Sequence, residues 1–264
     1  MAEMADGPQV SVCMAAYNGS QFIEDQVHSI LSQLGDSDEL IIIDDCSTDD
    51  TVEHVKRIDD DRIRLLLNES NIGYVKTFDR ALRASRGRYV FLADQDDLWP
   101  AGRVEAMTKA LESADVVAGN LEILGQPGQR TPSPLRAEQS DQHLLNIVNT
   151  LADRRGYWGC AMGVRQDFLR IATPLPAPLF ESHDLWLALL GNATGSISHL
   201  EQTVTLRRIH EHNATPLKRR SIPRRIRSRV MLIQCLLIGM RRARLAGWTS
   251  RSQQLNAEKH GSHA

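Results

Sequence analysis

The chain has 264 residues, of which 42% are hydrophobic and 24% charged, as in an ordinary soluble globular protein with a sizeable core. Its four cysteines are far apart in the sequence and form no C-x-x-C pair. This pattern argues against a zinc site or a disulfide framework and suits a reducing cytosol. The first residues, MAEMADG, have neither the basic nor the apolar region of a secretory signal, so we expect a cytoplasmic protein.

The net charge of −2 is unevenly distributed along the chain. From Leu217 to the last residue there are twelve basic residues and one acidic residue, so this stretch carries +11 and the rest carries −13. An acidic body with a basic tail suggests two separate tasks.

Strands and helices are expected to alternate in the first hundred residues. Short apolar runs predict buried strands at 9–16, 40–43, 63–67 and 89–93. Apolar residues at helical spacing predict helices at about 22–34, 50–58 and 74–85. This order predicts an α/β fold, with a Rossmann-like, mostly parallel sheet and helices on both faces.

The second half of the chain is less regular. Helices are expected near 141–151 and from 184 to 190, and strands within 197–206. Residues 125–134, GQPGQRTPSP, have the composition of a loop or linker.

Polar segments directly follow three of the predicted strands, namely YNG, DDCSTDD and DQDD. Ligands bind at the carboxyl ends of the strands in parallel α/β sheets, so these segments predict a site. In the third segment, Asp94, Asp96 and Asp97 place three carboxylates within four residues. Their mutual repulsion would be relieved by a divalent cation, and oxygen ligands favour Mg²⁺ or Mn²⁺. A solvated turn or a helix cap is the alternative.

These segments, in this order, resemble the family 2 glycosyltransferases of the GT-A fold. The resemblance covers residues 10 to about 100 without a break, through A-x-Y-N-G, I-I-I-D-D-x-S-T-D-D-T, N-x-G and G-R-Y-V-F-L-A-D-Q-D-D-L-W. The D-Q-D-D-L-W variant is most similar to a rhamnosyltransferase-like branch that adds sugars to bacterial polysaccharides. Later segments at 159–160, 183–186 and 208–213 match the same branch.

The resemblance implies a role for each matching residue. In the donor site, Ala15 and Tyr17 would line the base, Asp45 would bond its pyrimidine edge, Asp94 and Asp96 would hold the ribose, and Lys76 would face the diphosphate. The metal ligands would be Asp96, Asp97 and His210, with Asp184 as the general base. Trp158, Trp186 and Arg208 would bind the acceptor. One departure is that Arg207 stands where related sequences often carry an aromatic residue.

The implied reaction is an inverting, metal-dependent transfer of a sugar, with rhamnose favoured, from a dTDP- or UDP-sugar to a glycan or lipid-linked acceptor. Residues 1–120 would bind the nucleotide sugar, 121–216 would bind the acceptor, and 217–264 would form a basic, partly apolar helical tail. Two alternatives remain open, a sugar-phosphate nucleotidyltransferase and an inactive nucleotide- or sugar-binding module. The first usually has a Gly-rich, Arg-bearing phosphate loop after its first strand, and residues 17–21 are not such a loop.

Simpler interpretations exist for several of these residues. Asp184 could cap or stabilise a helix start, His210 could be a surface residue, and the tryptophans could belong to the core. In the tail, residues 230–240 are apolar but too short to span a bilayer. They fit an interfacial helix at the inner face of an anionic membrane or a helix packed on the core. Nucleic acid is not expected as a partner, because the body is acidic and has no binding motif.

Overall fold

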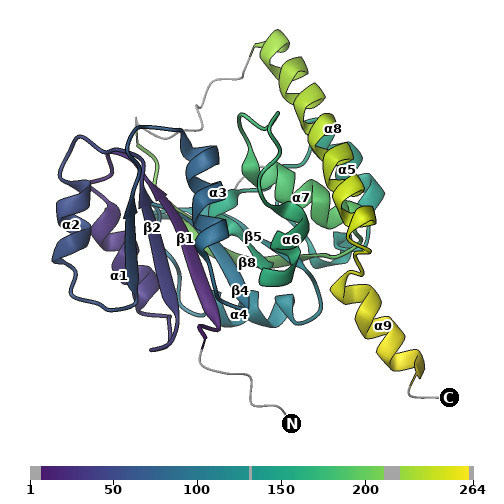
Figure 1. The fold of residues 1–264 in the computed structure, drawn as a ribbon, viewed down its shortest axis with the longest axis horizontal. Helices are drawn as coiled ribbons and strands as arrows, with labels where there is room; N and C mark the ends of the chain where they lie inside the picture. The colour runs from purple at the N-terminus through teal and green to yellow at the C-terminus, as the bar shows by residue number, and fades with distance from the viewer. Residues whose placement is uncertain (1–6, 131–132, 211–220, 262–264) are drawn as a thin grey trace.

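A computed structural model describes residues 7–130, 133–210 and 221–261 (Figure 1). Its centre is an eight-stranded sheet of order β3-β2-β1-β4-β7-β5-β6, with β8 paired to β5. The strands are β1 Val10–Ala16, β2 Glu39–Asp44, β3 Ile63–Leu67, β4 Tyr89–Asp94, β5 Val116–Ile123, β6 Gln126–Arg130, β7 Met162–Arg165 and β8 Ile197–Arg207. The helices are α1 Ile23–Leu31, α2 Thr51–Arg57, α3 Tyr74–Ala84, α4 Arg103–Leu111, α5 His143–Leu151, α6 Leu169–Ala172, α7 His183–Ala193, α8 Ile222–Leu245 and α9 Arg251–Gly261.

The first four strands are parallel and alternate with helices, which confirms the predicted α/β arrangement. Strands β1, β2 and β4 are buried on both faces of the sheet, as expected for a parallel sheet covered by helices. Val12 faces a core formed with α1, α2 and α4, and its neighbour Cys13 faces a second core formed with α3, α6, α7 and α8. Helices therefore cover both faces, and the carboxyl ends of the strands are left to loops.

The second half completes the sheet largely with antiparallel pairs. Strand β7 lies between β4 and β5 and is antiparallel to both, whereas β8 runs parallel to β5. The loop expected at 125–134 is wrong for residues 126–130, which form β6 and pair with the end of β5. Pairing with a neighbouring strand overrides the turn composition of this segment, since β6 lies at the edge of the sheet and tolerates Pro127.

The basic tail folds back onto the body as the 24-residue helix α8, which contacts α5, α6 and α7. Its buried face includes Met231, Cys235 and Gly239. A Cβ atom at Gly239 would lie 2.5 Å from the Trp186 ring, so the glycine permits close helix packing. One face of the tail is therefore a core-packing helix, one of the two expected alternatives. Within the described residues, no helix is both long and apolar enough to cross a membrane.

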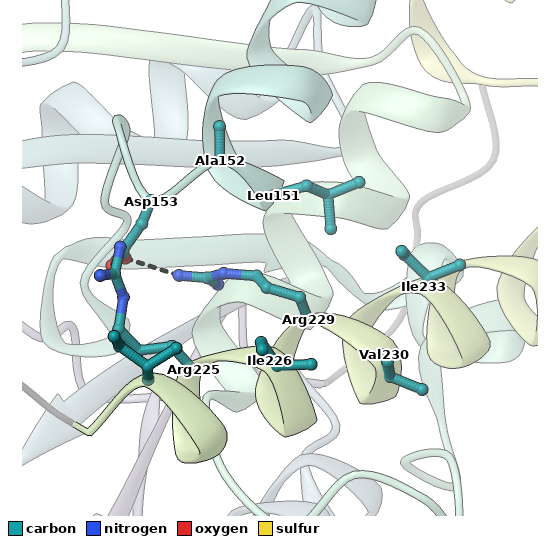
Figure 2. Close-up of a pocket in the computed structure, with 9 residues that line it drawn as sticks. Leu151, Ala152, Asp153, Arg225, Ile226, Arg229, Val230 and Ile233 are labelled. Carbon is teal, nitrogen blue, oxygen red and sulfur yellow. Dashed lines mark hydrogen bonds and ion pairs between the residues drawn. The ribbon is translucent and has the colours of Figure 1, made fainter.

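Ion pairs fix the first half of α8 to the end of α5 (Figure 2). The Arg225 and Arg229 side chains both reach the Asp153 carboxylate, with N–O distances of 3.3 and 2.5 Å. Because Asp153 and Arg225 are substantially exposed, these pairs orient the helix more than they stabilise it.

Candidate active site

The register of β1 with its neighbours brings the three predicted polar segments together. Ala15 lies opposite Asp94 on β4, and Ala16 lies opposite Asp44 on β2. The Gln95 side chain then joins two of the segments, since its Oε1 accepts from the Tyr17 N–H at 2.8 Å and its Nε2 donates to the Tyr17 carbonyl at 2.9 Å. The three segments therefore lie together at the carboxyl-end edge of the parallel strands.

The carboxylates of the second segment hold the backbone around them. Asp45 is buried, and its Oδ1 accepts from the Asn68 amide at 2.7 Å and the Ile72 N–H at 2.9 Å. Its Oδ2 accepts from the Gly73 N–H at 2.8 Å. Asp45 therefore fixes the loop that leads into α3, a task that the sequence did not reveal. Asp44 shapes its own loop by accepting from the Ser47 N–H at 2.9 Å.

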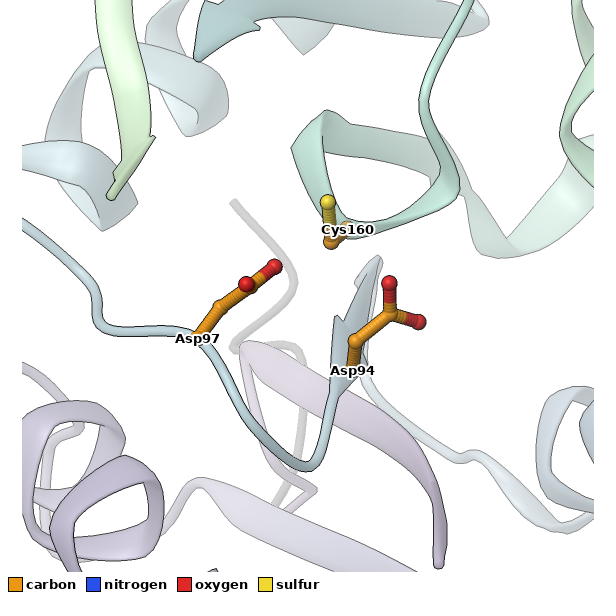
Figure 3. A group of neighbouring side chains, drawn as sticks. All are labelled: Asp94, Asp97 and Cys160. Carbon is orange, nitrogen blue, oxygen red and sulfur yellow. The ribbon is translucent and has the colours of Figure 1, made fainter. Parts of the chain in front are cut away.

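The carboxylates of the third segment face one another instead. Oxygens of Asp94 and Asp97 and the sulfur of Cys160 lie within 4.8 Å of one another (Figure 3). Burial, followed by repulsion from Asp97 and Asp96, raises the pKa of Asp94 well above its usual value. Burial and the charge of Asp96 raise the pKa of Asp97 to about 6.

This arrangement fits a divalent cation. The raised pKa values of Asp94 and Asp97 show that burial and mutual repulsion disfavour their charged forms, and a bound cation would offset both effects. Cys160, which sequence reasoning missed, is the third member of this group, but a soft sulfur is a poorer ligand for Mg²⁺ or Mn²⁺ than the carboxylate oxygens. Instead, its hydrogen bond to Asp97 lowers the pKa of that carboxyl, against the effect of burial.

The end of β8 closes the acidic turn from the opposite side. His210 Nε2 lies 2.7 Å from Asp96 Oδ2, and its ring packs on Phe22 with centroids 4.6 Å apart. The Arg208 N–H donates to Asp97 Oδ1 at 3.1 Å, and its Nε donates to the Asp96 carbonyl at 3.2 Å. The structure thus joins the predicted pair Asp96 and His210. Residues 211–213 of this motif lie outside the described residues.

Two arginines that the sequence analysis did not assign lie near the acidic cluster. The charge of Arg207 lowers the pKa of both Asp94 and Asp97, and its guanidinium lies 5.0 Å from the centre of the Trp158 ring. Arg103 is buried and donates to the carbonyls of Val204 at 2.8 Å and Leu92 at 3.1 Å. Burial lowers its pKa to about 9, so it stays charged at neutral pH. In the sequence, only the R-R-I-H motif pointed to Arg207. No sequence pattern around Arg103 predicts that this arginine is buried.

Asp184 reaches this edge from the first turn of α7, as the sequence predicted. Its negative charge contributes to the raised pKa of Asp94, so the two carboxylates lie close enough to interact electrostatically. A Cβ atom at Gly159 would lie 3.7 Å from Asp184 Cβ, so the turn that carries Cys160 passes directly beside Asp184. The neighbouring His183 is buried and stacked on Phe78, and burial lowers its pKa to about 3.

The remaining predicted residues differ in exposure. Tyr17 is 45% exposed, Lys76 is exposed on α3, and Ala15 and Trp158 are half-buried. Trp186 is fully buried in the core, where its Nε1 donates to the Ala172 carbonyl. The prediction that Trp186 binds the acceptor is therefore wrong, because α8 packs over the indole and leaves no surface for a ligand.

Comparison with known proteins identifies the family. The sequence model described as glycosyl transferase family 2 matches residues 11–171, more than half of the chain. The chain belongs to glycosyl transferase family 2. The predicted family resemblance is thereby confirmed.

Two curated relatives show the range of similarity to this family 2 glycosyltransferase. A putative teichuronic acid biosynthesis glycosyltransferase of Bacillus subtilis, TuaG, is 41% identical over 100 residues, which are 37% of this chain and 40% of the relative. The Escherichia coli UDP-Glc:alpha-D-GlcNAc-diphosphoundecaprenol beta-1,3-glucosyltransferase WfgD is 33% identical over 117 residues, 44% of this chain and 46% of the relative. The chain thus spans less than half of the length of these curated relatives.

The fold is also similar to that of a solved glycosyltransferase. The crystal structure of S. aureus TarS in complex with UDP-GlcNAc is 19% identical in sequence and superposes with a TM-score of 0.65. The superposition covers 89% of this chain and 72% of the TarS chain in that structure, which spans TarS residues 1–349. This likeness confirms the predicted α/β fold of GT-A type.

Proposed function

We propose that this family 2 glycosyltransferase moves a sugar, with inversion, from a nucleotide-diphosphate sugar to a hydroxyl group of a glycan or lipid-linked acceptor. The observation that carries the proposal is that Asp184, on α7, lies beside the Gly159–Cys160 turn, whose Cys160 sulfur adjoins Asp94 and Asp97. Asp184 is also close enough to Asp94 for its charge to raise the pKa of that carboxyl. A candidate base thereby lies beside a candidate site for a metal and a diphosphate, the two parts that an inverting transfer needs. The UDP-GlcNAc named in the TarS complex supports a nucleotide-sugar donor.

The donor would lie along the carboxyl ends of β1, β2 and β4. Ala15 and Tyr17 would line the base, and Asp45 would bond its edge. A carboxylate has about four acceptor positions, and the three bonds to Asp45 leave one of them on Oδ2. Asp94 would bond the ribose, and exposed Lys76 would approach the diphosphate from α3.

Asp96, Asp97 and His210 would hold Mg²⁺ or Mn²⁺. The bound ion would neutralise charge on the diphosphate as it leaves. Arg208 would keep the carboxylates in place, since its backbone and side chain bind Asp97 and the Asp96 carbonyl. Its predicted contact with an acceptor, and that of Trp158, remain part of the proposal.

Asp184 would take the proton of the acceptor hydroxyl while that oxygen attacks the anomeric carbon. The bond from this carbon to the diphosphate breaks in the same displacement, so the configuration inverts. Its place in the first turn of α7 favours the carboxylate form, because the positive end of the helix dipole stabilises an anion there.

The finer assignments are part of the same proposal. Residues 1–120 would bind the donor and 121–216 the acceptor, with a dTDP- or UDP-sugar, rhamnose among the candidates, used in cell-surface polysaccharide synthesis. WfgD is named for a diphosphoundecaprenol acceptor, which supports a lipid-linked acceptor and a cytoplasmic location at the inner face of the membrane. The tail 217–264 would serve this location.

The test is the variant Asp184→Asn. We expect a loss of turnover of roughly 10²- to 10⁴-fold, because a positioned base contributes about that much. Calorimetric binding of UDP or dTDP with Mn²⁺ should be unchanged. The control Asp61→Asn removes an exposed carboxylate before β3 and should leave both readouts unaltered. Near-full transfer by Asp184→Asn would rule out the assigned base.

A further inference from the structure

Helix α8 has a second apolar face, opposite the one packed on the body. The side chains on this face are 44% to 70% exposed and follow each other at intervals of three or four residues: Ile222, Ile226, Val230, Ile233, Leu237 and Met240. Such spacing places them on one side of a helix, as a stripe about five turns long. A stripe of this length on the surface of a single chain indicates an interaction site.

The stripe continues onto α5. Leu151, at the end of α5, faces Ile226, Val230 and Ile233 across a cavity of about 290 Å³ (Figure 2). Seven and three residues before Leu151, Leu144 and Val148 lie on the same side of α5, and both are exposed. The exposed apolar surface therefore covers two adjacent helices with a shallow groove between them.

The charges around the stripe indicate which kind of partner can bind there. Helix α8 has seven arginines and no acidic residue, so it carries +7. Helical geometry places Arg225 and Arg229 along one side of the stripe, held by Asp153, and Arg227 and Arg241 along the other. A second copy of this chain would bring an equal positive charge against the first. An anionic lipid surface complements both the apolar stripe and its basic borders.

We propose that the exposed face of α8 and α5, which we call the α8–α5 face, binds the surface of an anionic membrane. The apolar stripe would enter the boundary between headgroups and acyl chains, and the arginines would contact lipid phosphates. A helix in the plane of the interface needs no spanning segment, in agreement with the amphipathic character of α8.

The same helix holds the segment that precedes the candidate base. The Arg224 guanidinium donates to Glu181 Oε2 at 3.1 Å, and the Ser228 hydroxyl donates to Glu181 Oε1. Glu181 is buried, three residues before Asp184. The α8–α5 face is therefore fixed to the start of α7, so docking would set the distance from the membrane to Asp184. This part of the inference rests on the proposed function, since it concerns a lipid-linked acceptor.

The experiment is co-sedimentation of the full chain with phosphatidylcholine vesicles, with and without phosphatidylglycerol. We expect binding only to the anionic vesicles, and this binding should weaken as salt is added.

Variants of α8 test which side chains bind the vesicles. Ile226→Ser/Leu237→Ser should weaken vesicle binding roughly tenfold or more, because apolar burial is lost, whereas Ile226→Leu/Leu237→Ile should bind like the wild type. Arg241→Gln/Arg244→Gln should also weaken it roughly tenfold or more, at about 1 kcal/mol per basic residue. Lys56→Gln/Lys109→Gln, which removes equal charge from α2 and α4, should have little effect.

Calorimetric binding of UDP or dTDP with Mn²⁺ separates failure of this inference from failure of the proposed function. A wild type that binds a nucleotide but no anionic vesicle would overturn the membrane surface and leave the donor site intact. Sedimentation velocity tests the alternative that a second copy of this chain binds the face. If the wild type forms a dimer that Ile226→Ser/Leu237→Ser dissociates, and binds no vesicles, the face is a contact between copies and the membrane proposal is overturned. Vesicle binding unaffected by both double substitutions on α8 would place the membrane contact elsewhere and also overturn the proposal.

Discussion

Two acidic loops lie at the same edge of the sheet, and their carboxylates are used in opposite ways. In the loop after β2, Asp45 accepts three hydrogen bonds, and Asp49 accepts from the N–H groups of Ser20 and Thr51. At the end of β4 and in the loop after it, Asp94 and Asp97 approach one another and a neighbouring carboxylate, and their pKa values are raised. The first loop uses its negative charge to shape the backbone, whereas burial and repulsion disfavour negative charge in the second loop.

The difference comes from the donors that surround each loop. Backbone N–H groups of the segments before α1 and α3 point at the first loop, so its charges are solvated by the protein. Near Asp94 and Asp97 the described donors are fewer, chiefly the Cys160 thiol and the Arg208 N–H. A cluster of acids that the protein only partly neutralises is suited to a ligand that brings positive charge.

The largest effect should follow a substitution in the second loop. Asp96→Asn removes the carboxylate that contacts His210, and loss of charge stabilisation worth several kcal/mol should lower transfer about a thousandfold. Calorimetry should show that Mn²⁺ no longer strengthens UDP binding. Asp50→Asn removes the same charge from an exposed position in the first loop and should change neither result. Equal losses in the two variants would contradict the contrast between the loops.

How far the sequence predicted these loops depends on the range of the interactions involved. The strands and the three polar segments were visible, because they depend on local apolar runs and on motifs. The partners of Asp45 come from residues 68–73, and those of Asp97 from Cys160 and Arg208, which no pattern near the acids indicates. Trp186 was misjudged for the same reason, since only the path of α8 buries it. The sequence therefore located the candidate site but not the division of tasks within it.

A smaller effect, on stability, is expected at Asp45. In Asp45→Asn, one carboxylate oxygen becomes an NH₂ group that cannot accept a hydrogen bond. An NH₂ group in place of Oδ2 leaves the Gly73 N–H without its acceptor, and one in place of Oδ1 does the same to the Ile72 N–H and the Asn68 amide. Leaving a buried donor unsatisfied costs about 1–3 kcal/mol, so the free energy of unfolding should fall by about 2 kcal/mol or more. Urea unfolding measures it, with Asp50→Asn as the control. A change below about 0.5 kcal/mol, the size of an ordinary surface effect, would mean that Asp45 does not hold the loop.

In the second loop, loss of a carboxylate should raise the free energy of unfolding instead of lowering it, provided that no metal is bound. Because the pKa of Asp97 is raised to about 6, the folded state retains a proton that the unfolded state releases near pH 4. The stability of the metal-free protein should therefore fall as pH rises from about 4 to about 6 and stay lower above that range. Asp97→Asn should remove this contribution and increase stability at pH 8 by about 1–2 kcal/mol.

Urea unfolding with a chelator from pH 4 to pH 8 tests this sign, with Asp61→Asn as the matched control. Saturating Mn²⁺ should stabilise the wild type more than Asp97→Asn, since the ion needs the carboxylate that the variant lacks. A variant that is less stable than the wild type at pH 8 without metal would show that Asp97 is held favourably as an anion. The two loops would then be alike.

The smallest effect is expected where the second loop contacts the segment after β1. Gln95→Ala removes two hydrogen bonds to the Tyr17 backbone in a largely exposed position, so the free energy of unfolding should fall by only about 1 kcal/mol. Because Tyr17 is proposed to line the base, UDP affinity should also fall by a few-fold. The small stability loss cannot cause this fall by itself, since the variant remains folded. Gln21→Ala, an exposed neighbour of the same segment, controls for the loss of an amide. Unchanged UDP affinity in Gln95→Ala would show that the base region keeps its form without the acidic loop, and the two loops would then act independently on the donor.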